Sequence, residues 1–245
     1  MFVVSSDFYS GLSANGKAKV INRVMRFILD KEFVGHDMEV TMEMKALISL
    51  AAVELTFGFE SFLIPYLHTI HVSPDIFYSR LAKSHVKGLT FETGRMYLSW
   101  KSVQEGMDDK TDGLHLALHE MAHALKIDTV KGSPTKERFP FYLNTWMRFA
   151  KQVMVKEQQS GFLRAYAWVN LHEFLAVCLE NFIERPKEFY KAEPTLFAHT
   201  CYLMNQFPLE PANRELNLHA QRALSKHTGV QFPRAKQQDY PHHNW

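Results

Sequence analysis

Two histidines and a glutamate occur together in the segment HEMAH, His119 to His123. On a helix, residues four apart lie about 6 Å apart on one face, so two imidazoles at this spacing can bind one metal ion. The glutamate that follows the first histidine is then placed to act as a general base on water at the ion. We therefore expect His119 and His123 to bind zinc and Glu120 to be the general base of a hydrolytic site.

A third histidine, His115, lies one turn before this segment. His115 and His123 are separated by about 12 Å of helical rise. Two nitrogens that each lie about 2.1 Å from one zinc ion cannot be that far apart. Because Glu120 directly follows His119, the pair His119 and His123 is favoured over the pair His115 and His119.

A catalytic zinc site needs a third protein ligand and leaves a fourth position for water. The metzincin pattern would place a glycine at position 126 and a histidine at position 129, where this sequence has Lys126 and Thr129. No histidine occurs between His123 and His172. The remaining source is a glutamate from a second helix.

A long helix is predicted over about 162–184, where Pro186 stops it. It supplies two candidate ligands, Glu173 and Glu180. Five residues share one face of such a helix, because they follow the helical spacing: Tyr166, Asn170, Glu173, Val177 and Glu180. This polar stripe, opposite the HExxH helix, indicates a site between the two helices.

The other elements follow from periodicity and turn signals. The pattern predicts an α+β fold, mostly helical with a small sheet. Helices are expected over about 20–28, from an N-cap at Thr41 through 55, from a cap at Asp112 through the HExxH motif, and over 194–204. Strands are expected at 67–73 and 94–100, and a loop at 128–136.

Bulk composition excludes several classes of function. The chain has 245 residues, a formal net charge of +2 and two cysteines, Cys178 and Cys201. It lacks the basic excess of a nucleic-acid binder, and its longest apolar stretch, ALISLAAVEL, is too short to span a membrane. Without a secretory signal or a disulfide framework, a cytoplasmic location is expected. Residues 1–210 should form the main domain, and 211–245 a C-terminal extension or tail.

Several blocks of sequence resemble the zinc-dependent peptidases of the Mlc titration factor A family, over about residues 8–210. The blocks are FILDKEFVGHDMEVTMEMKALIS, GRMYLSWKSVQEG, HEMAHAL, YAWVNLHEFLAVCLENFIERP and PTLFAHTCYLMNQFP. The catalytic domain of this family is in turn similar to that of anthrax lethal factor. The resemblance implies a zincin-like metallopeptidase domain whose active-site helix carries the HExxH motif.

The resemblance also assigns roles to individual residues. It implies one Zn²⁺ per chain, bound by His119, His123 and Glu173, with Glu120 as the general base. A tyrosine seven residues before the glutamate ligand belongs to the family's site, and it matches Tyr166.

The hydroxyl of Tyr166 is suited to stabilise the oxyanion of a tetrahedral intermediate. Asn170 and Glu180 also match family positions, and we expect them to orient the metal ligands. The sequence departs from the family at Lys126, where an aspartate is common. Asp128 is the acidic residue available to take its place.

The expected reaction is hydrolysis of a peptide bond in a peptide or protein substrate. We expect an extended substrate to pair with the strand at Met96 to Ser99 as an edge of the sheet. The alternative is a regulatory binding protein with a structural or vestigial zinc site, because the resemblance implies binding of a transcriptional repressor. Glu120 favours the enzyme, since a structural site has no use for it.

Overall fold

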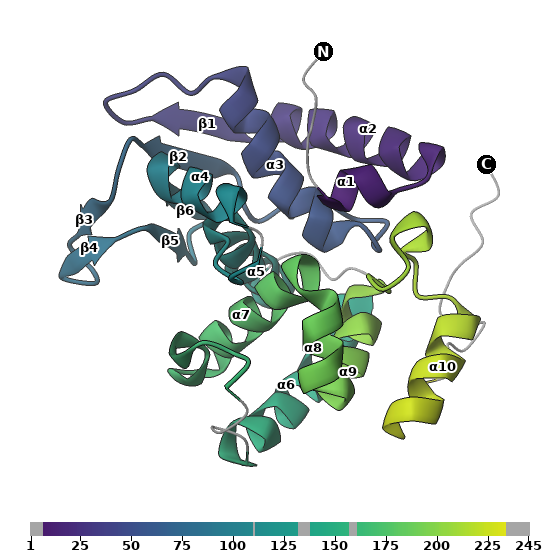
Figure 1. Cartoon of the computed structure of the whole chain (residues 1–245). Helices are drawn as coiled ribbons and strands as arrows, with labels where there is room; N and C mark the ends of the chain where they lie inside the picture. Colours follow the sequence, from purple (N-terminus) through teal and green to yellow (C-terminus); the bar gives the residue numbers. More distant parts are fainter. Residues whose placement is uncertain (1–6, 110, 132–137, 157–160, 234–245) are drawn as a thin grey trace.

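The computed structural model describes residues 7–109, 111–131, 138–156 and 161–233. Its architecture is α+β, as expected, with most of the described residues in helices (Figure 1). The helices are α1 (Asp7–Gly11), α2 (Ala14–Asp30), α3 (Met42–Thr56), α4 (Trp100–Asp108), α5 (Leu116–Lys131), α6 (Arg138–Lys156), α7 (Leu171–Glu184), α8 (Pro186–Ala192), α9 (Pro194–Met204) and α10 (Leu218–Thr228), with 3-10 turns η1 (Ala165–Trp168) and η2 (Pro211–Asn213).

The main sheet has four strands in the order β1-β2-β6-β5. Strands β1 (Glu32–Gly35), β2 (Thr69–Ser73) and β6 (Arg95–Ser99) are parallel, whereas β5 (Gly88–Phe91) runs antiparallel to β6. The predicted strand at Met96 to Ser99 is therefore an inner strand, and its expected role as a free edge is wrong. The edge on that side is β5. A separate hairpin of β3 (Phe77–Ser79) and β4 (Ser84–Val86) projects beyond the sheet (Figure 1).

One face of the sheet packs against helices. Side chains alternate across a strand, and alternate residues of the two central strands are fully buried: Ile70 and Val72 on β2, and Met96 and Leu98 on β6. Helix α5 contacts α3, α7, β5 and β6, so it lies between the sheet and the remaining helices (Figure 1). The HExxH segment is thus carried by the central helix of the fold.

Helix α3 begins as the sequence predicts. Thr41 caps it by accepting a hydrogen bond from the backbone nitrogen of Met44 at 3.2 Å. Eleven of its 15 residues are buried, which makes it a core helix. Its C-terminal end is capped by a residue that is distant in sequence. The side-chain amide of Gln206 donates to the carbonyls of Glu54 and Leu55 at 3.0 and 2.8 Å.

The predicted helix over 162–184 is wrong in its first part. Residues Ala165–Trp168 form the turn η1, and α7 begins only at Leu171. The cause is Asn170, which is extended and whose side-chain oxygen accepts from the backbone nitrogens of His172 and Glu173. Asparagine is among the preferred N-cap residues. Tyr166 therefore belongs to a different element from Glu173.

The start and end of α5 also differ from prediction. Asp112 does not cap the helix, because its side chain accepts from the nitrogen of Leu114 in the preceding turn. Instead, Nδ1 of His115 accepts from the nitrogen of Leu118 at 3.2 Å, in the position of an N-cap. The helix continues to Lys131, so the first four residues of the predicted loop are helical. Positions 132–136 of that loop lie outside the described residues.

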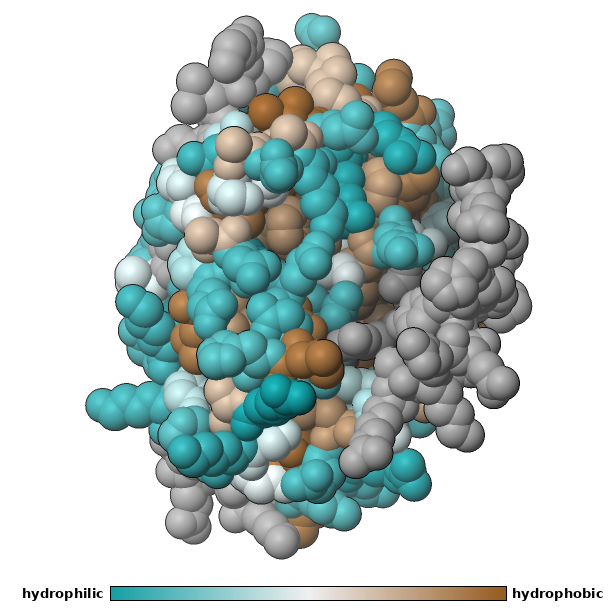
Figure 2. Space-filling model, turned by 90° about the vertical axis from the view of Figure 1, so that its right-hand side faces the viewer, coloured by the Kyte–Doolittle hydropathy of each residue, from teal (hydrophilic) through white to brown (hydrophobic). Residues whose placement is uncertain are grey.

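The segment expected to be a C-terminal extension contains α10, whose Ala220 and Leu224 are buried in the main hydrophobic core and which contacts α9. Both cysteines are buried free thiols, as expected. None of the helices in the described part of the chain has the length and apolar character needed to cross a bilayer. On the face shown in Figure 2, hydrophobic residues lie in small areas separated by hydrophilic ones.

Candidate metal centre

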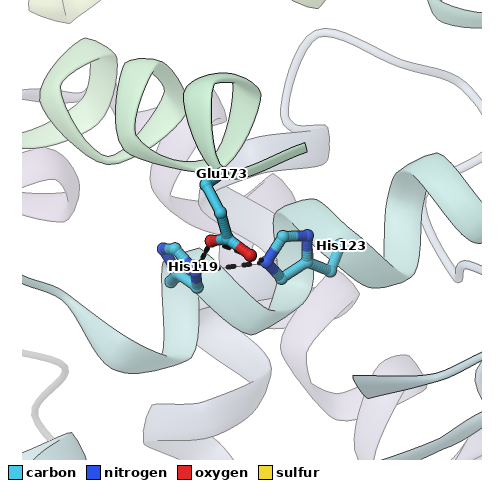
Figure 3. Close-up of side chains that lie close together, drawn as sticks. All are labelled: His119, His123 and Glu173. Carbon is cyan, nitrogen blue, oxygen red and sulfur yellow. Dashed lines mark hydrogen bonds and ion pairs between the residues drawn. The ribbon is translucent and has the colours of Figure 1, made fainter. Parts of the chain in front are cut away.

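Three of the residues singled out in the sequence come together between α5 and α7. One ligand atom each from His119, His123 and Glu173 lies within 4.8 Å of the other two (Figure 3). Nε2 of His119 is 3.1 Å from Nε2 of His123 and 3.0 Å from Oε2 of Glu173. The distance from Nε2 of His123 to the same oxygen is 3.4 Å. Of the two glutamates that the spacing left open, Glu173 is the one in this cluster.

The three groups are suited to hold a divalent cation. Two imidazole nitrogens and one carboxylate oxygen are a donor set that catalytic zinc sites use. All three donor atoms point at one another from two packed helices (Figure 3). No other group of three such side chains meets this criterion within the described residues. The residues present therefore fit a single metal ion.

Burial disfavours the charged forms of His119 and Glu173, and their hydrogen bonds oppose this effect. Burial on its own would lower the pKa of His119, but its hydrogen bonds with Glu173 and Glu180 raise that pKa to about 9. Burial likewise opposes the charged form of Glu173, yet the bonds with His119 and His123 lower the pKa of Glu173. The carboxylates thus favour a positive charge at this point, whether it is a proton or a metal ion.

Glu120 lies beside the cluster and is held by the edge strand. It is buried, at 5% exposure, and the Thr90 hydroxyl on β5 donates to its Oε2 at 2.7 Å. Burial raises the pKa of Glu120, although the charges of His123 and His119 oppose that rise. A raised carboxyl pKa suits a group that must take up a proton near neutral pH.

Gly88 explains how β5 approaches so closely. A Cβ atom at this position would lie 2.6 Å from Oε1 of Glu120 and 2.8 Å from Cδ1 of Leu116. A residue with a side chain fits between the strand and α5 only if the side chains of Glu120 and Leu116 move. The space in front of Glu120 is therefore set by the glycine.

A cavity of about 550 Å³ opens onto these residues and is called the site cavity below. Its lining includes Gly88 on the edge strand, His119 and Glu120 on α5, and Arg164 and Tyr166 from the segment before α7. The volume suits a substrate side chain or a short peptide segment. His123 and Glu173 do not line it, so the cavity reaches the cluster from the side of His119.

Tyr166 lies near the cluster although it is not on α7. Its ring centroid is 5.9 Å from that of His119, and the residue is 49% exposed. Burial, together with the charges of Glu173 and Glu120, raises the pKa of Tyr166. The hydroxyl thus keeps its proton and remains a hydrogen-bond donor at neutral pH.

Glu180 supports His119 from behind. Its carboxylate is almost fully buried, and Oε1 accepts from Nδ1 of His119 at 2.6 Å. Oε2 accepts from the backbone nitrogen of His115 at 3.0 Å. Burial opposes its charge, but the bonds from His119 and Arg164 lower the pKa of Glu180. Such a carboxylate fixes the ring of a histidine ligand so that its other nitrogen faces the metal.

Arg164 was not predicted from the sequence, and it completes the surroundings of Glu180. Its Nη1 and Nη2 donate to Oε2 and Oε1 of Glu180 at 2.8 and 2.9 Å. Nη1 also donates to the carbonyl of Gly113 at 2.5 Å. An arginine outside a known motif carries no spacing signal, so only the folded structure identifies it.

The side chains of Asn170 and Asp128, both considered as supports of the candidate ligands, bind backbone groups. Asn170 uses its side-chain oxygen to cap α7, so it reaches Glu173 through the backbone. Asp128 accepts from the backbone nitrogen of Tyr66 at 2.7 Å, which ties α5 to the loop before β2. Lys126 lies 3.5 Å from Nε2 of His172.

A second cavity, of about 610 Å³, lies on the other side of His115. Its lining includes Glu54, Asp108 and Glu184. Both carboxylate oxygens of Glu184 are buried and have no hydrogen-bond partner within the described part of the chain. Burial and the charge of Glu180 raise the pKa of Glu184 to about 9.

Comparison with known sequences decides the family. A sequence model of the family described as "Glucose-regulated metallo-peptidase M90" matches residues 2–203. The chain belongs to this family. A protein of Synechocystis sp., described as uncharacterized, is 26% identical over 224 residues, which cover 83% of this chain and 80% of the relative. Mlc titration factor A of Escherichia coli is 24% identical over 234 residues, 86% and 87% of the two chains. That of Klebsiella pneumoniae is 25% identical over 221 residues, 81% and 82%.

Proposed function

We propose that this protein is a zinc-dependent metallopeptidase with one Zn²⁺ per chain and a zincin-like catalytic domain. The observation that carries the proposal is the convergence of His119, His123 and Glu173, with Glu120 buried beside them. Membership of a metallopeptidase family supports the same conclusion. The proposed main domain spans residues 1–210 and the proposed C-terminal extension residues 211–245.

The chain's own residues supply the proton chemistry. Zinc bound to the three ligands would polarise the scissile carbonyl and lower the pKa of a water molecule. Glu120, held by Thr90, takes a proton from the attacking water and passes it to the leaving amine. Tyr166 donates a hydrogen bond to the oxyanion that forms. Glu180 and Asn170 orient His119 and Glu173.

The edge strand β5 is the place where an extended peptide substrate adds to the sheet. Its pairing with β6 leaves its other side free of any strand in the described sheets, and Gly88 and Thr90 bring it against Glu120. Backbone hydrogen bonds to an edge strand align a peptide without regard to its sequence. The site cavity then receives a neighbouring side chain of the substrate.

The decisive experiment measures zinc content and peptide hydrolysis in the same preparations. Wild type should contain one zinc per chain and cleave short chromogenic peptides. Glu120→Gln should keep the zinc and lose the hydrolysis, whereas Glu173→Ala should lose both. Glu188→Gln, an exposed glutamate on α8, is the matched control and should behave as wild type. A wild type that binds zinc but cleaves nothing would overturn the enzymatic proposal.

A second candidate function is regulatory binding of a protein partner, with zinc in a structural or vestigial role. The names of the relatives, Mlc titration factor A, support it. If wild type and Glu120→Gln bind a transcriptional repressor equally in a pull-down, binding is established as an activity separate from hydrolysis. Within either proposal we place the protein in the cytoplasm, because its buried cysteines are free thiols.

A further inference from the structure

Arg164 stands at a junction of three parts of the site. Its guanidinium forms a two-bonded fork with Glu180 at 2.8 and 2.9 Å. The same group donates to the carbonyl of Gly113, in the turn that leads into α5. Arg164 also precedes Tyr166 by two residues, and its guanidinium carbon lies 5.8 Å from the centroid of that ring.

The carboxylate of Glu180 is 1% exposed, so it depends on its partners for charge compensation. Each oxygen accepts two hydrogen bonds: Oε1 from His119 and Arg164, and Oε2 from the backbone of His115 and from Arg164. Arg164 is the only one of these donors with a permanent charge. Without it, the buried carboxylate would keep two bonds and lose its one permanent counter-charge.

We infer that Arg164 is a positioning residue that acts on the metal centre through Glu180. The fork fixes the plane of the carboxylate, the carboxylate fixes the His119 ring through Nδ1, and the ring then presents Nε2 to His123 and Glu173. By also holding Gly113, the guanidinium keeps the start of α5 in register with α7. This inference rests on the proposed metal site.

A direct role in binding substrate is the alternative for Arg164, because it lines the site cavity and its side chain is 26% exposed. An arginine that captures a substrate carboxylate must have donors free to reach it. Here three of the five N–H groups are already engaged, because Nη1 donates to Glu180 and Gly113 and Nη2 donates to Glu180. The geometry therefore favours positioning over capture.

The test is a double-mutant cycle for zinc affinity, measured by competition with a chromogenic chelator. The variants are Arg164→Gln, Glu180→Gln and the double variant. Each single substitution should weaken zinc binding by about 10–100-fold, the usual effect of losing a residue that orients a ligand. The double variant should be no weaker than the more affected single one, because the two residues act as one unit. Multiplication of the two effects would show independent roles and overturn the inference.

Two further variants guard against general destabilisation. Arg164→Lys keeps the charge but not the fork, and it should recover part of the lost affinity. Arg185→Gln is the control for loss of an arginine, and this residue directly follows α7. Arg185 donates to Asn181 at 3.3 Å and packs over Phe162, away from the metal ligands. It should bind zinc as wild type does. Equal losses in Arg164→Gln and Arg185→Gln would contradict the inference.

A measurement without metal separates this inference from the proposed function. In nitrogen-15 spectra of the metal-free protein, the His119 Nδ1 proton should give a strongly downfield resonance, because it is bonded to a buried carboxylate at 2.6 Å. Arg164→Gln should shift or broaden it, and Arg185→Gln should not. If wild type binds no zinc, the proposed function fails, and this resonance still decides whether Arg164 orders His119. An unchanged resonance in Arg164→Gln would overturn the inference alone.

Discussion

The site cavity and the second cavity lie on either side of His115, which lines both, and they have volumes of about 550 and 610 Å³. Both contain buried or partly buried carboxylates. In the site cavity the carboxylates of Glu120 and Glu180 meet imidazole, hydroxyl or guanidinium donors. In the second cavity Glu184 has no such partner among the described residues.

The contrast shows that neither cavity size nor the number of acids identifies a site. The larger cavity has more carboxylates in its lining and none of the histidine pair or the arginine. What distinguishes the site cavity is that its buried carboxylates, Glu120 and Glu180, have partners of defined geometry. Glu180 and Glu184, one helical turn apart on α7, show the same difference: the pKa of one is lowered and that of the other is raised.

Replacing Glu120 by glutamine gives the largest expected effect. Loss of a general base lowers a rate by about 10²–10⁴-fold, so kcat should fall by that amount. The metal content should stay at the wild-type level, since Glu120 is not in the ligand cluster. Steady-state hydrolysis and elemental analysis measure the two quantities. Unchanged hydrolysis in this variant would mean that the site cavity cannot be distinguished from the second cavity as the place of the reaction.

Gly88→Ala should have the next largest effect. The new methyl group would crowd Oε1 of Glu120 and Cδ1 of Leu116, and overpacking of this kind typically costs about 1–3 kcal/mol. That cost falls on the stability of the fold. We also expect kcat/KM to fall by roughly tenfold or more, because the methyl group displaces the carboxylate of Glu120 from its position, while zinc is retained. Gly161→Ala is the matched glycine control, because no atom lies within 4 Å of a Cβ there. Because Gly161 has a positive φ, alanine there should lower the stability slightly. Hydrolysis should persist.

Glu184→Gln tests the second cavity through stability. The pKa of Glu184 is raised from 4.5 to about 9 by folding, so between these values the unfolded state releases the proton and the folded state keeps it. Wild-type stability should therefore decline as pH rises through this window, an effect that glutamine removes. We expect equal stability at pH 5 and a gain of about 1–3 kcal/mol for the variant near pH 8–9. Denaturant unfolding at both pH values measures it, and hydrolysis should not change.

Glu43→Gln should give the smallest effect. Glu43 lines the second cavity and lies in the first turn of α3. A negative charge there interacts favourably with the helix dipole by about 0.3–1 kcal/mol. The variant should lose that much stability and keep full hydrolysis and zinc content. A large loss of hydrolysis would show that the second cavity belongs to the reaction.

The chemistry of the site was more predictable from sequence than the elements that assemble it. His119, Glu120 and His123 follow from spacing within one helix, which is a local property. The choice between Glu173 and Glu180 does not, because both face the HExxH helix and only packing decides which reaches the cluster. For that choice the family resemblance was needed.

The sequence-based predictions were wrong where two local signals conflict, and they were missing where the sequence carries no local signal. Asn170 is a typical N-cap residue, and it marks the break before α7 that the periodicity concealed. The edge strand β5 and helix α6 were not predicted at all. Pairing order in a sheet and partners such as Thr90 and Arg164 depend on contacts between distant segments, which local patterns do not encode.

The two hydrogen bonds from Gln206 to the end of α3 have a consequence for folding on the ribosome. They join residues 152 and 151 positions apart, so they close a loop that contains most of the chain. The entropic cost of closing this loop must be met before the two hydrogen bonds can stabilise the fold. Helix α3 packs against α5, and its end stays open until residue 206 has left the exit tunnel. The end of α3 is therefore capped only after His119, His123 and Glu173 have all been synthesised, and a nascent chain stalled before Gln206 would carry these three residues while the end of α3 lacks this cap.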